Sequence, residues 1–229
     1  MDTIVSGVYE VPGYSRSYII DGDEGVTLID TGLPGRHKAI IGVLAAIGRS
    51  MADVRAIAVT HAHFDHVGGA AALKRETTAP LFASAIDAPA IRGEKPSPPP
   101  PALERVPFIE SLMRLMPRSA SVDVDQFVAE GKTGSLPEDL AVVETPGHTP
   151  GHVSFLLDRS GGVLFVGDAA MSTKNGDIKR GLMNRSTPTF DASLRHIAEF
   201  KFEVAFFGHS ERLAGSASAA FQRFAGSLP

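Results

Sequence analysis

The chain has 229 residues, of which 43% are hydrophobic and 21% charged, and it contains no cysteine and no tryptophan. This composition is that of a folded globular protein, and the length fits one large domain or one domain with an insertion. The net charge of -4 argues against a protein that holds nucleic acid through a broad basic surface. Without cysteine, disulfides, thiolate metal sites and cysteine nucleophiles are excluded.

Targeting signals are not found in the sequence. The first residues carry no basic segment followed by a long apolar stretch, and no apolar run approaches the length of a membrane span. We therefore expect a cytoplasmic protein that acts on a small molecule and has neither nucleic acid nor a membrane as its partner. The sequence makes no prediction of the oligomeric state.

Strands and helices alternate over the first ninety residues. Short β-rich or apolar runs predict strands, with a hairpin turn at residues 21–25, and apolar residues at helical spacing predict helices. Gly48 is suited to follow the first helix, because glycine adopts the left-handed conformation common at that position. The expected strands are residues 5–11, 17–21, 26–30, 54–60 and 80–83, and the expected helices are residues 34–47 and 68–76.

Residues 88–130 interrupt this alternation. Five prolines between Pro96 and Pro101 exclude regular structure there, because proline lacks an amide donor and fixes φ. Apolar segments follow at residues 106–116, where we expect a helix, and at residues 122–128. The region is either a linker with a packing helix or a lid over a site, since long excursions within a compact domain are often functional.

The second half returns to strands followed by helices. We expect capping of the first of these helices by the region that includes Thr189 and Asp191, and we interpret the isolated His196 as an ordinary polar residue. Two groups of strands, each followed by helices, predict two sheets covered by helices in one domain. The expected strands are residues 140–144, 153–157, 163–167 and 204–207, with a hairpin turn at 158–162, and the expected helices are residues 190–200 and one that contains 221–224.

Three of the eight histidines lie within six residues, in the segment Thr60-His61-Ala62-His63-Phe64-Asp65-His66. On an extended chain, side chains two residues apart point the same way, so His61 and His63 can reach one metal ion. Asp65 and His66, where the chain turns into a helix, can serve a second ion. Imidazole and carboxylate ligands suit zinc, and also iron, manganese or cobalt. Packing does not explain the cluster, because buried polar groups without partners cost about 1–3 kcal/mol each.

This segment resembles the H-x-H-x-D-H signature of the metallo-β-lactamase superfamily. Four further motifs of that family follow its order along the chain, and their joint spacing is more specific than any single match. They are Leu28-Ile29-Asp30-Thr31-Gly32, the run from Thr145 to His152 (TPGHTPGH), Gly167-Asp168-Ala169 and Gly208-His209. The resemblance implies an α/β fold, the four-layer αβ/βα sandwich, as a single domain of residues 1–229 with a Pro-rich insertion or lid at about 88–130.

The resemblance also implies two divalent metal ions, with zinc as the first expectation and iron or manganese as alternatives. Asp30 is expected to orient a ligand histidine through a hydrogen bond. His152 is expected to shape the loop after His148 by hydrogen bonding rather than to bind metal. The implied ligands are His61, His63 and His148 for the first ion, Asp65, His66 and His209 for the second, and Asp168 as a bridge between both.

Two ions held about 3.5–4 Å apart can share a hydroxide, because metal binding lowers the pKa of water toward about 7. A substrate carbonyl on one ion would be polarised. Asp65 is the expected catalytic residue, which orients the nucleophile and passes a proton to the leaving group. The expected function is therefore a dinuclear metal-dependent hydrolase that uses a metal-bridging hydroxide to cleave a small ester, thioester or lactone.

Other activities on the same fold stay open. A single-iron persulfide dioxygenase engages fewer of the seven ligands, and a regulatory module would have lost some of them. True β-lactamases of the superfamily usually lack the bridging aspartate, and ribonuclease Z-like phosphodiesterases usually carry a tRNA-binding arm. Glyoxalase II-type thioesterases usually have a C-terminal helical region, whereas about 20 residues follow His209 here. Many acyl-homoserine-lactone lactonases have a tyrosine at the position of Met171.

Basic residues follow Asp168 in the sequence: Lys174, Lys179, Arg180 and Arg185. They form either a solvated charged loop or a contact for an anionic substrate. The weak candidates for substrate binding are Met171, Lys179 and Arg180.

Overall fold

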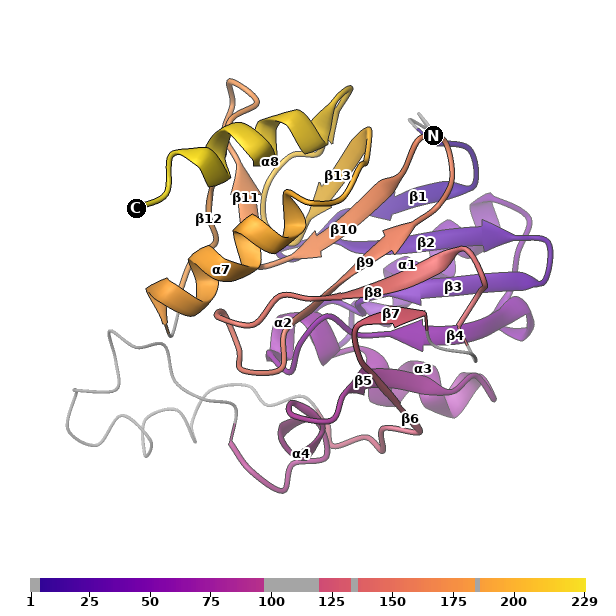
Figure 1. The fold of residues 1–229 in the computed structure, drawn as a ribbon. Helices are drawn as coiled ribbons and strands as arrows, with labels where there is room; N and C mark the ends of the chain where they lie inside the picture. Colours follow the sequence, from indigo (N-terminus) through magenta and orange to yellow (C-terminus); the bar gives the residue numbers. More distant parts are fainter. Residues whose placement is uncertain (1–4, 97–119, 133–135, 184–185) are drawn as a thin grey trace. The chain divides into compact units, whose positions relative to one another are not determined.

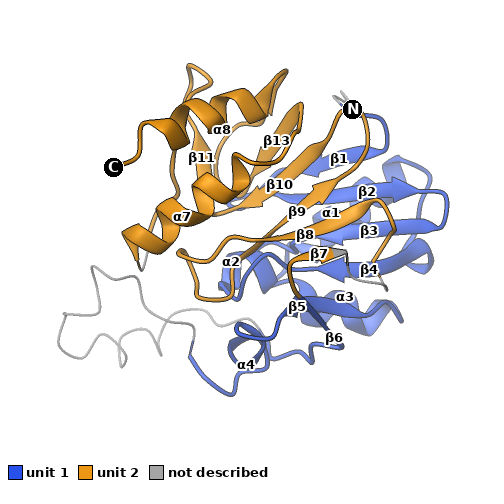
Figure 2. Cartoon of the chain, in the orientation of Figure 1, with its two compact units in different colours: residues 1–97, 117–128 blue, residues 98–116, 129–229 orange. Residues whose placement is uncertain are grey.

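The structure is a computed structural model that describes residues 5–96, 120–132, 136–183 and 186–229. Contacts within the chain divide it into two compact units (Figures 1 and 2): residues 1–97 with 117–128, and residues 98–116 with 129–229. Each unit contains one of the two expected groups of strands. The helix expected at 106–116 lies outside the described residues. None of the helices in the described ranges has the length and apolar character that crossing a membrane requires.

Unit 1 is built on a six-stranded sheet in the order β1-β2-β3-β4-β5-β6. The pairs β1–β2 and β2–β3 are antiparallel, whereas β3 to β6 run parallel. The predicted hairpin joins β2 to β3, where Gly22 pairs with Gly25. The strands are β1 Val8–Val11, β2 Ser17–Gly22, β3 Gly25–Ile29, β4 Val54–Ala58, β5 Leu81–Ser84 and β6 Gln126–Val128.

The helices α1 (His37–Ala46), α3 (Ala70–Glu76) and α4 (Ala88–Ile91) pack on this sheet. Leu44, Leu73 and Ile91 from these helices share one hydrophobic core with Leu28 and Ile57 from the strands. Helix α1 begins at His37 rather than at residue 34 as predicted, but the predicted role of Gly48 is confirmed: Gly48 has a φ of 76°, and the N–H of Arg49 donates to the carbonyl of Leu44 at 2.8 Å. A short 3-10 helix, η1 (Met51–Asp53), precedes β4.

The helix predicted at residues 68–76 is wrong at its start. The helix α2 spans Phe64–Val67, and α3 begins only at Ala70. The chain turns between them because the Thr31 backbone lies against it: a Cβ on Gly69 would lie 2.5 Å from the Thr31 carbonyl oxygen. The Gly69 amide donates to Thr31 Oγ1 at 3.1 Å. The histidine-rich segment has no apolar periodicity, so its helical turn was not predicted.

Unit 2 is built on a six-stranded sheet in the order β14-β13-β10-β9-β8-β7, in which only the pair β10–β13 is parallel. The strands β8 (Leu140–Glu144), β9 (Val153–Leu157), β10 (Val163–Gly167) and β13 (Val204–Phe207) have the predicted bounds. The strands β7 (Gly131–Lys132) and β14 (Leu213–Ala214) are too short to show a pattern. A separate two-stranded ribbon, β11 (Ala170–Ser172) with β12 (Ile178–Arg180), was not predicted.

Helix α7 spans Thr187–Ile197, three residues earlier than predicted, and α8 spans Ala217–Gly226. The predicted capping by Thr189 and Asp191 is wrong, because Ser186 caps α7 by accepting a hydrogen bond from the Thr189 amide at 3.4 Å. Proline at position 188 suits the first turn that follows this cap. Phe190 of α7 and Phe221 of α8 belong to the core that covers β10 and β13.

Candidate metal centre

The candidate ligands of unit 1 follow the carboxyl end of β4. Because β3, β4 and β5 are parallel, their carboxyl ends share one edge of the sheet, where ligands of α/β proteins commonly bind. Asp30 follows β3, His61 follows β4, and Asp87 follows β5. The Ala62 amide donates to Asp87 Oδ2 at 3.0 Å, which fixes the backbone of the histidine-rich loop at this edge.

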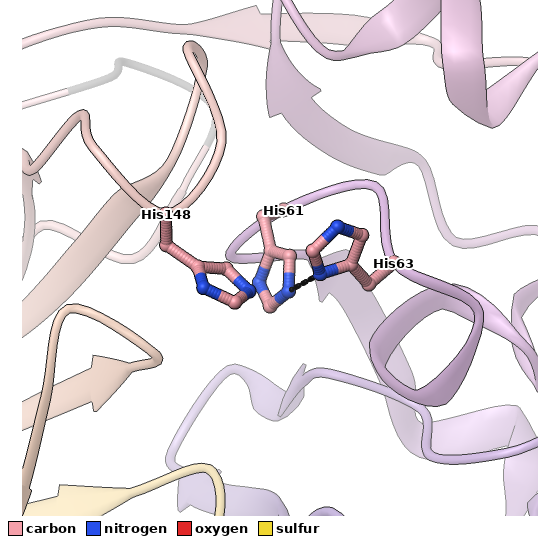
Figure 3. A group of neighbouring side chains, drawn as sticks. All are labelled: His61, His63 and His148. Carbon is pink, nitrogen blue, oxygen red and sulfur yellow. Dashed lines mark hydrogen bonds between the residues drawn. The ribbon is translucent and has the colours of Figure 1, made fainter. Parts of the chain in front are cut away.

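His61 and His63 approach one another as the alternation along the chain predicted. Nε2 of His61 lies 3.1 Å from Nδ1 of His63 (Figure 3). Two nitrogens bound to one tetrahedral zinc ion, each about 2.0–2.1 Å from it, are about 3.4 Å apart. The spacing of the two ring nitrogens therefore fits two ligands of a single ion.

Asp30 connects two of these histidines. Its Oδ2 lies 2.8 Å from His66 Nδ1, and its Oδ1 accepts the Thr60 amide at 2.8 Å. The Thr60 hydroxyl lies 2.8 Å from Asp30 Oδ2 and 3.0 Å from His61 Nδ1. Since a hydroxyl has one proton, Thr60 donates to Asp30 and accepts from the Nδ1–H of His61. His61 and His66 therefore carry their protons on Nδ1, which leaves the Nε2 lone pairs for a metal.

Asp65 and His66 form a second pair of donors on helix α2. Oδ2 of Asp65 lies 3.8 Å from Nε2 of His66, and both side chains are buried. The main-chain carbonyl of Asp65 accepts a hydrogen bond from the Ser15 hydroxyl. Ser15 thus holds the backbone of Asp65, and the Asp65 carboxylate lies beside the imidazole of His66.

In unit 2, His148, Asp168 and His209 gather at one edge of the sheet. Asp168 follows β10 and His209 follows β13, and these strands are parallel, so both residues lie at the same edge. His148 lies in the loop between β8 and β9. Oδ2 of Asp168 is 3.4 Å from His148 Nε2 and 3.3 Å from His209 Nε2. One carboxylate oxygen therefore faces two imidazoles.

The segment 180–182 holds this group in place. His148 Nδ1 donates to the Leu182 carbonyl at 2.8 Å, so its Nε2 carries the lone pair. A Cβ on Gly181 would lie 2.0 Å from the carbonyl oxygen of Asp168, so only glycine allows this approach. Arg180 makes a bidentate ion pair with Asp191 of α7, with contacts of 2.5 and 2.8 Å. The three residues together tie His148 and Asp168 to helix α7.

His152 uses both of its ring nitrogens within the protein. Its Nε2 accepts the Asp168 amide at 3.0 Å, so its proton is on Nδ1, which donates to Thr145 Oγ1 at 2.8 Å. A further hydrogen bond of 3.0 Å joins the Thr145 hydroxyl to the Ser154 hydroxyl. Ser154 then donates to the Val166 carbonyl, also at 3.0 Å. These contacts give His152 a loop-shaping role and leave no nitrogen for a metal.

The three substrate-binding candidates lie on the ribbon that follows Asp168. Met171 of β11 is partly buried, and Lys179 of β12 is exposed. Arg180 is committed to Asp191, and this ion pair favours a structural role over substrate binding. Arg185 lies outside the described residues.

Three residues that position the site were not identified from the sequence: Thr60, Asp87 and Leu182. Thr60 directly precedes His61, and its hydroxyl is the one signal that could have been noticed. Leu182 contributes a main-chain carbonyl, which every residue possesses, so no residue type could indicate it.

A separate, shallow surface pocket of about 370 Å³ in unit 2 lies beside the stretch that leads to His148. Burial lowers the pKa of His196, but hydrogen bonds to Glu130 and Glu199 outweigh burial and raise it above its ordinary value. None of the candidate metal ligands lines this pocket. It is lined by Glu130, Glu144, Pro146, Thr189, Ala192, Ser193 and His196.

The donor set fits a divalent metal. Imidazole nitrogens with assigned tautomers, together with carboxylates, are the ligands that zinc and similar ions prefer. The family model of the metallo-beta-lactamase superfamily matches residues 11–209. The chain belongs to this superfamily.

Two proteins of similar sequence support this membership. A probable metallo-hydrolase of Bacillus subtilis (strain 168), YflN, is 28% identical over 92% of this chain and 83% of its own length. An N-acyl homoserine lactonase of a Bacillus species is 25% identical over 84% of this chain and 79% of its own. This metallo-β-lactamase superfamily member is therefore a metal-dependent hydrolase.

A solved structure confirms the fold. A metallo-beta-lactamase family protein of Thermus thermophilus matches with a TM-score of 0.73 and 25% identity, over 98% of this chain and 80% of that chain. The expected α/β class and metallo-β-lactamase fold are confirmed.

Proposed function

We propose that this superfamily member is a dinuclear metal-dependent hydrolase that cleaves a small ester, thioester or lactone. The observation that carries the proposal is the orientation of three imidazoles. His61, His66 and His148 each direct Nδ1 to an oxygen acceptor and present Nε2 as a lone pair. The similarity to an N-acyl homoserine lactonase favours a lactone among the three substrate types.

We assign the seven family positions as ligands of two divalent ions, with zinc as the proposed metal. When bound, such a pair supplies a water-derived nucleophile at neutral pH and polarises the scissile carbonyl. The family match over residues 11–209 supports one domain of residues 1–229. The proposed ligands are His61, His63 and His148 for one ion, Asp65, His66 and His209 for the other, and Asp168 for both.

The residues of the chain then have distinct tasks. Asp65 accepts a proton from the attacking water at its carboxylate and returns it to the leaving group. Asp30 and Thr60 keep the imidazoles of His61 and His66 in one tautomer. Asp168 is held through its amide by His152 and through its carbonyl side by the close approach of Gly181.

Metal content and activity test the proposal together. Elemental analysis should find two ions per chain, and dialysis against a chelator should abolish hydrolysis, which zinc should restore. The panel should contain a thioester, a lactone, an ester, a phosphodiester and a β-lactam. Full hydrolysis by verified metal-free protein would contradict the proposal. A single iron per chain with oxygen consumption on a persulfide would replace it with the dioxygenase alternative.

Asp65→Asn should lower kcat by about 10²–10⁴-fold, the usual contribution of a general acid-base residue, while the fold is kept. Asp158→Asn, at an exposed aspartate in the turn after β9, is the matched control and should retain full activity. Circular dichroism establishes that both variants are folded. Wild-type turnover by folded D65N would exclude Asp65 as the proton carrier.

A further inference from the structure

Two large apolar side chains are exposed next to the segment that fixes His148. The exposed fraction is 58% for Leu182 and 52% for Met183. Adjacent large apolar residues at a surface are typical of a place where a ligand or partner binds.

Their position relative to His148 is defined by the main chain. The Leu182 carbonyl accepts the Nδ1 proton of His148 at 2.8 Å. The preceding residue, Gly181, packs on the Asp168 carbonyl, and Arg180 is clamped by Asp191. These contacts fix the main chain from which the Leu182 side chain projects, one residue before Met183.

The backbone of Met183 is itself unusual. Its φ is 57°, in the left-handed region that side chains other than glycine, asparagine and aspartate rarely adopt. Backbone strain of this kind persists only where the surrounding structure holds it, and it clusters at active sites and ligand-binding segments. Here the strained residue is an exposed apolar one, so neither burial nor local hydrogen bonding by its side chain accounts for it.

We propose that Leu182 and Met183 form an apolar subsite that binds an aliphatic chain of the substrate beside His148. The inference rests on the proposed hydrolase function and narrows its substrate class to esters, thioesters or lactones that carry such a chain. Charge is consistent with this class, because Arg180, two residues before Leu182, is already paired with Asp191. The aliphatic chain belongs to either the acyl part or the alcohol part of the substrate, and the experiment below separates these two cases.

Leu182→Ser and Met183→Gly test the subsite without removing the main-chain carbonyl that holds His148. M183G also relieves the left-handed backbone, so it should fold at least as stably as the wild type. Phe127→Ser is the matched control, since Phe127 of β6 is 53% exposed, about as much as the two test residues.

Two series of esters show whether the aliphatic chain of the substrate belongs to its acyl part or to its alcohol part. The first extends the acyl group from p-nitrophenyl acetate to p-nitrophenyl octanoate, and the second extends the alcohol from ethyl acetate to octyl acetate. L182S and M183G should lower kcat/KM about tenfold for the long member of one series and less than twofold for its short member. F127S should change neither. Equal losses for long and short members, or no loss at all, would overturn the subsite.

Binding provides a readout that does not need turnover. Isothermal titration calorimetry of the zinc-loaded protein with octanoate and octanol should give a Kd about tenfold higher in L182S than in the wild type for one of them. If no ester is cleaved but this shift is seen, the proposed function fails and the subsite stands. If esters are cleaved and neither assay distinguishes L182S from wild type, only the subsite fails. Conversion of a wild-type dimer into a monomer by L182S, measured by light scattering, would assign the pair to a subunit interface instead.

Discussion

Oδ2 of Asp30 lies 2.8 Å from Nδ1 of His66, so the residue that follows β3 orients a side chain of helix α2. The same carboxylate reaches His61 through the Thr60 hydroxyl. One aspartate therefore sets the tautomer of two imidazoles, and it does so with a backbone φ of 57°.

Asp30→Ala should weaken zinc binding by about 10–100-fold, the usual effect of removing a hydrogen-bond partner of a ligand histidine. Competition with a chromophoric chelator measures the affinity. Asp21→Ala, which removes a partly exposed ion pair with Arg49 in the same unit, is the control and should bind zinc as the wild type does. Unchanged affinity in D30A would show that the carboxylate does not position the ligands.

His152→Ala should lower the free energy of unfolding by about 1–3 kcal/mol, because the Asp168 amide and the Thr145 hydroxyl lose a buried partner. It should still bind two ions per chain, whereas His148→Ala should lose one. Urea unfolding and elemental analysis provide the two measurements. Loss of an ion from folded H152A would assign His152 as a ligand after all.

Gly181→Ala should be strongly destabilising, because the new Cβ would lie 2.0 Å from the Asp168 carbonyl oxygen. We expect a loss of about 1–3 kcal/mol, as for overpacked sites. Gly42→Ala in helix α1 is the matched substitution, since no atom outside its chain neighbours and the helix's own backbone lies within 4 Å of its Cβ position. That variant should gain about 0.5–1 kcal/mol from helix propensity. Thermal denaturation of both tests the pair, and equal melting temperatures would contradict the close approach of Gly181 to Asp168.

The ion pair between Arg180 and Asp191 predicts a defined pH dependence. The Arg180 guanidinium holds the pKa of Asp191 below its ordinary value, against the opposing effect of burial. A carboxylate with a lowered folded pKa adds stability that is fully present above its unfolded pKa, about 3.9, and is lost as pH falls through its folded pKa. Asp191→Asn should therefore cost about 1–2 kcal/mol between pH 5 and 7, and the difference from wild type should shrink below about pH 3.9.

Metal-free protein should be used for this pH series, so that acid release of metal does not contribute. The exposed Asp177 supplies the control D177N, which should match the wild type at every pH. A D191N deficit that stays constant down to pH 2.5 would mean that the carboxylate charge does not stabilise the fold.

Much of unit 2 was predictable because its strands are apolar runs bounded by turns. The bounds of β8, β9, β10 and β13 follow from the run itself. Helix α7 was misplaced by three residues, because three residues of the sequence near its start, Ser186, Thr189 and Asp191, are all suitable caps, and only packing decides among them. The ribbon of β11 and β12 has strands of three residues, which are too short for a hydrophobic pattern.

The sequence by itself predicted the chemistry of the candidate site. Imidazole and carboxylate ligand atoms are part of the residue type, and the order of the five motifs resembles one family, which implies the seven ligand positions. Only the tertiary structure decided how these side chains are held. The Leu182 carbonyl at His148, the Asp30–Thr60 link to His61 and the use of both His152 nitrogens join residues far apart in the chain. Such contacts depend on where parallel strands end and on how a loop packs, and a main-chain carbonyl has no residue type by which to be recognised.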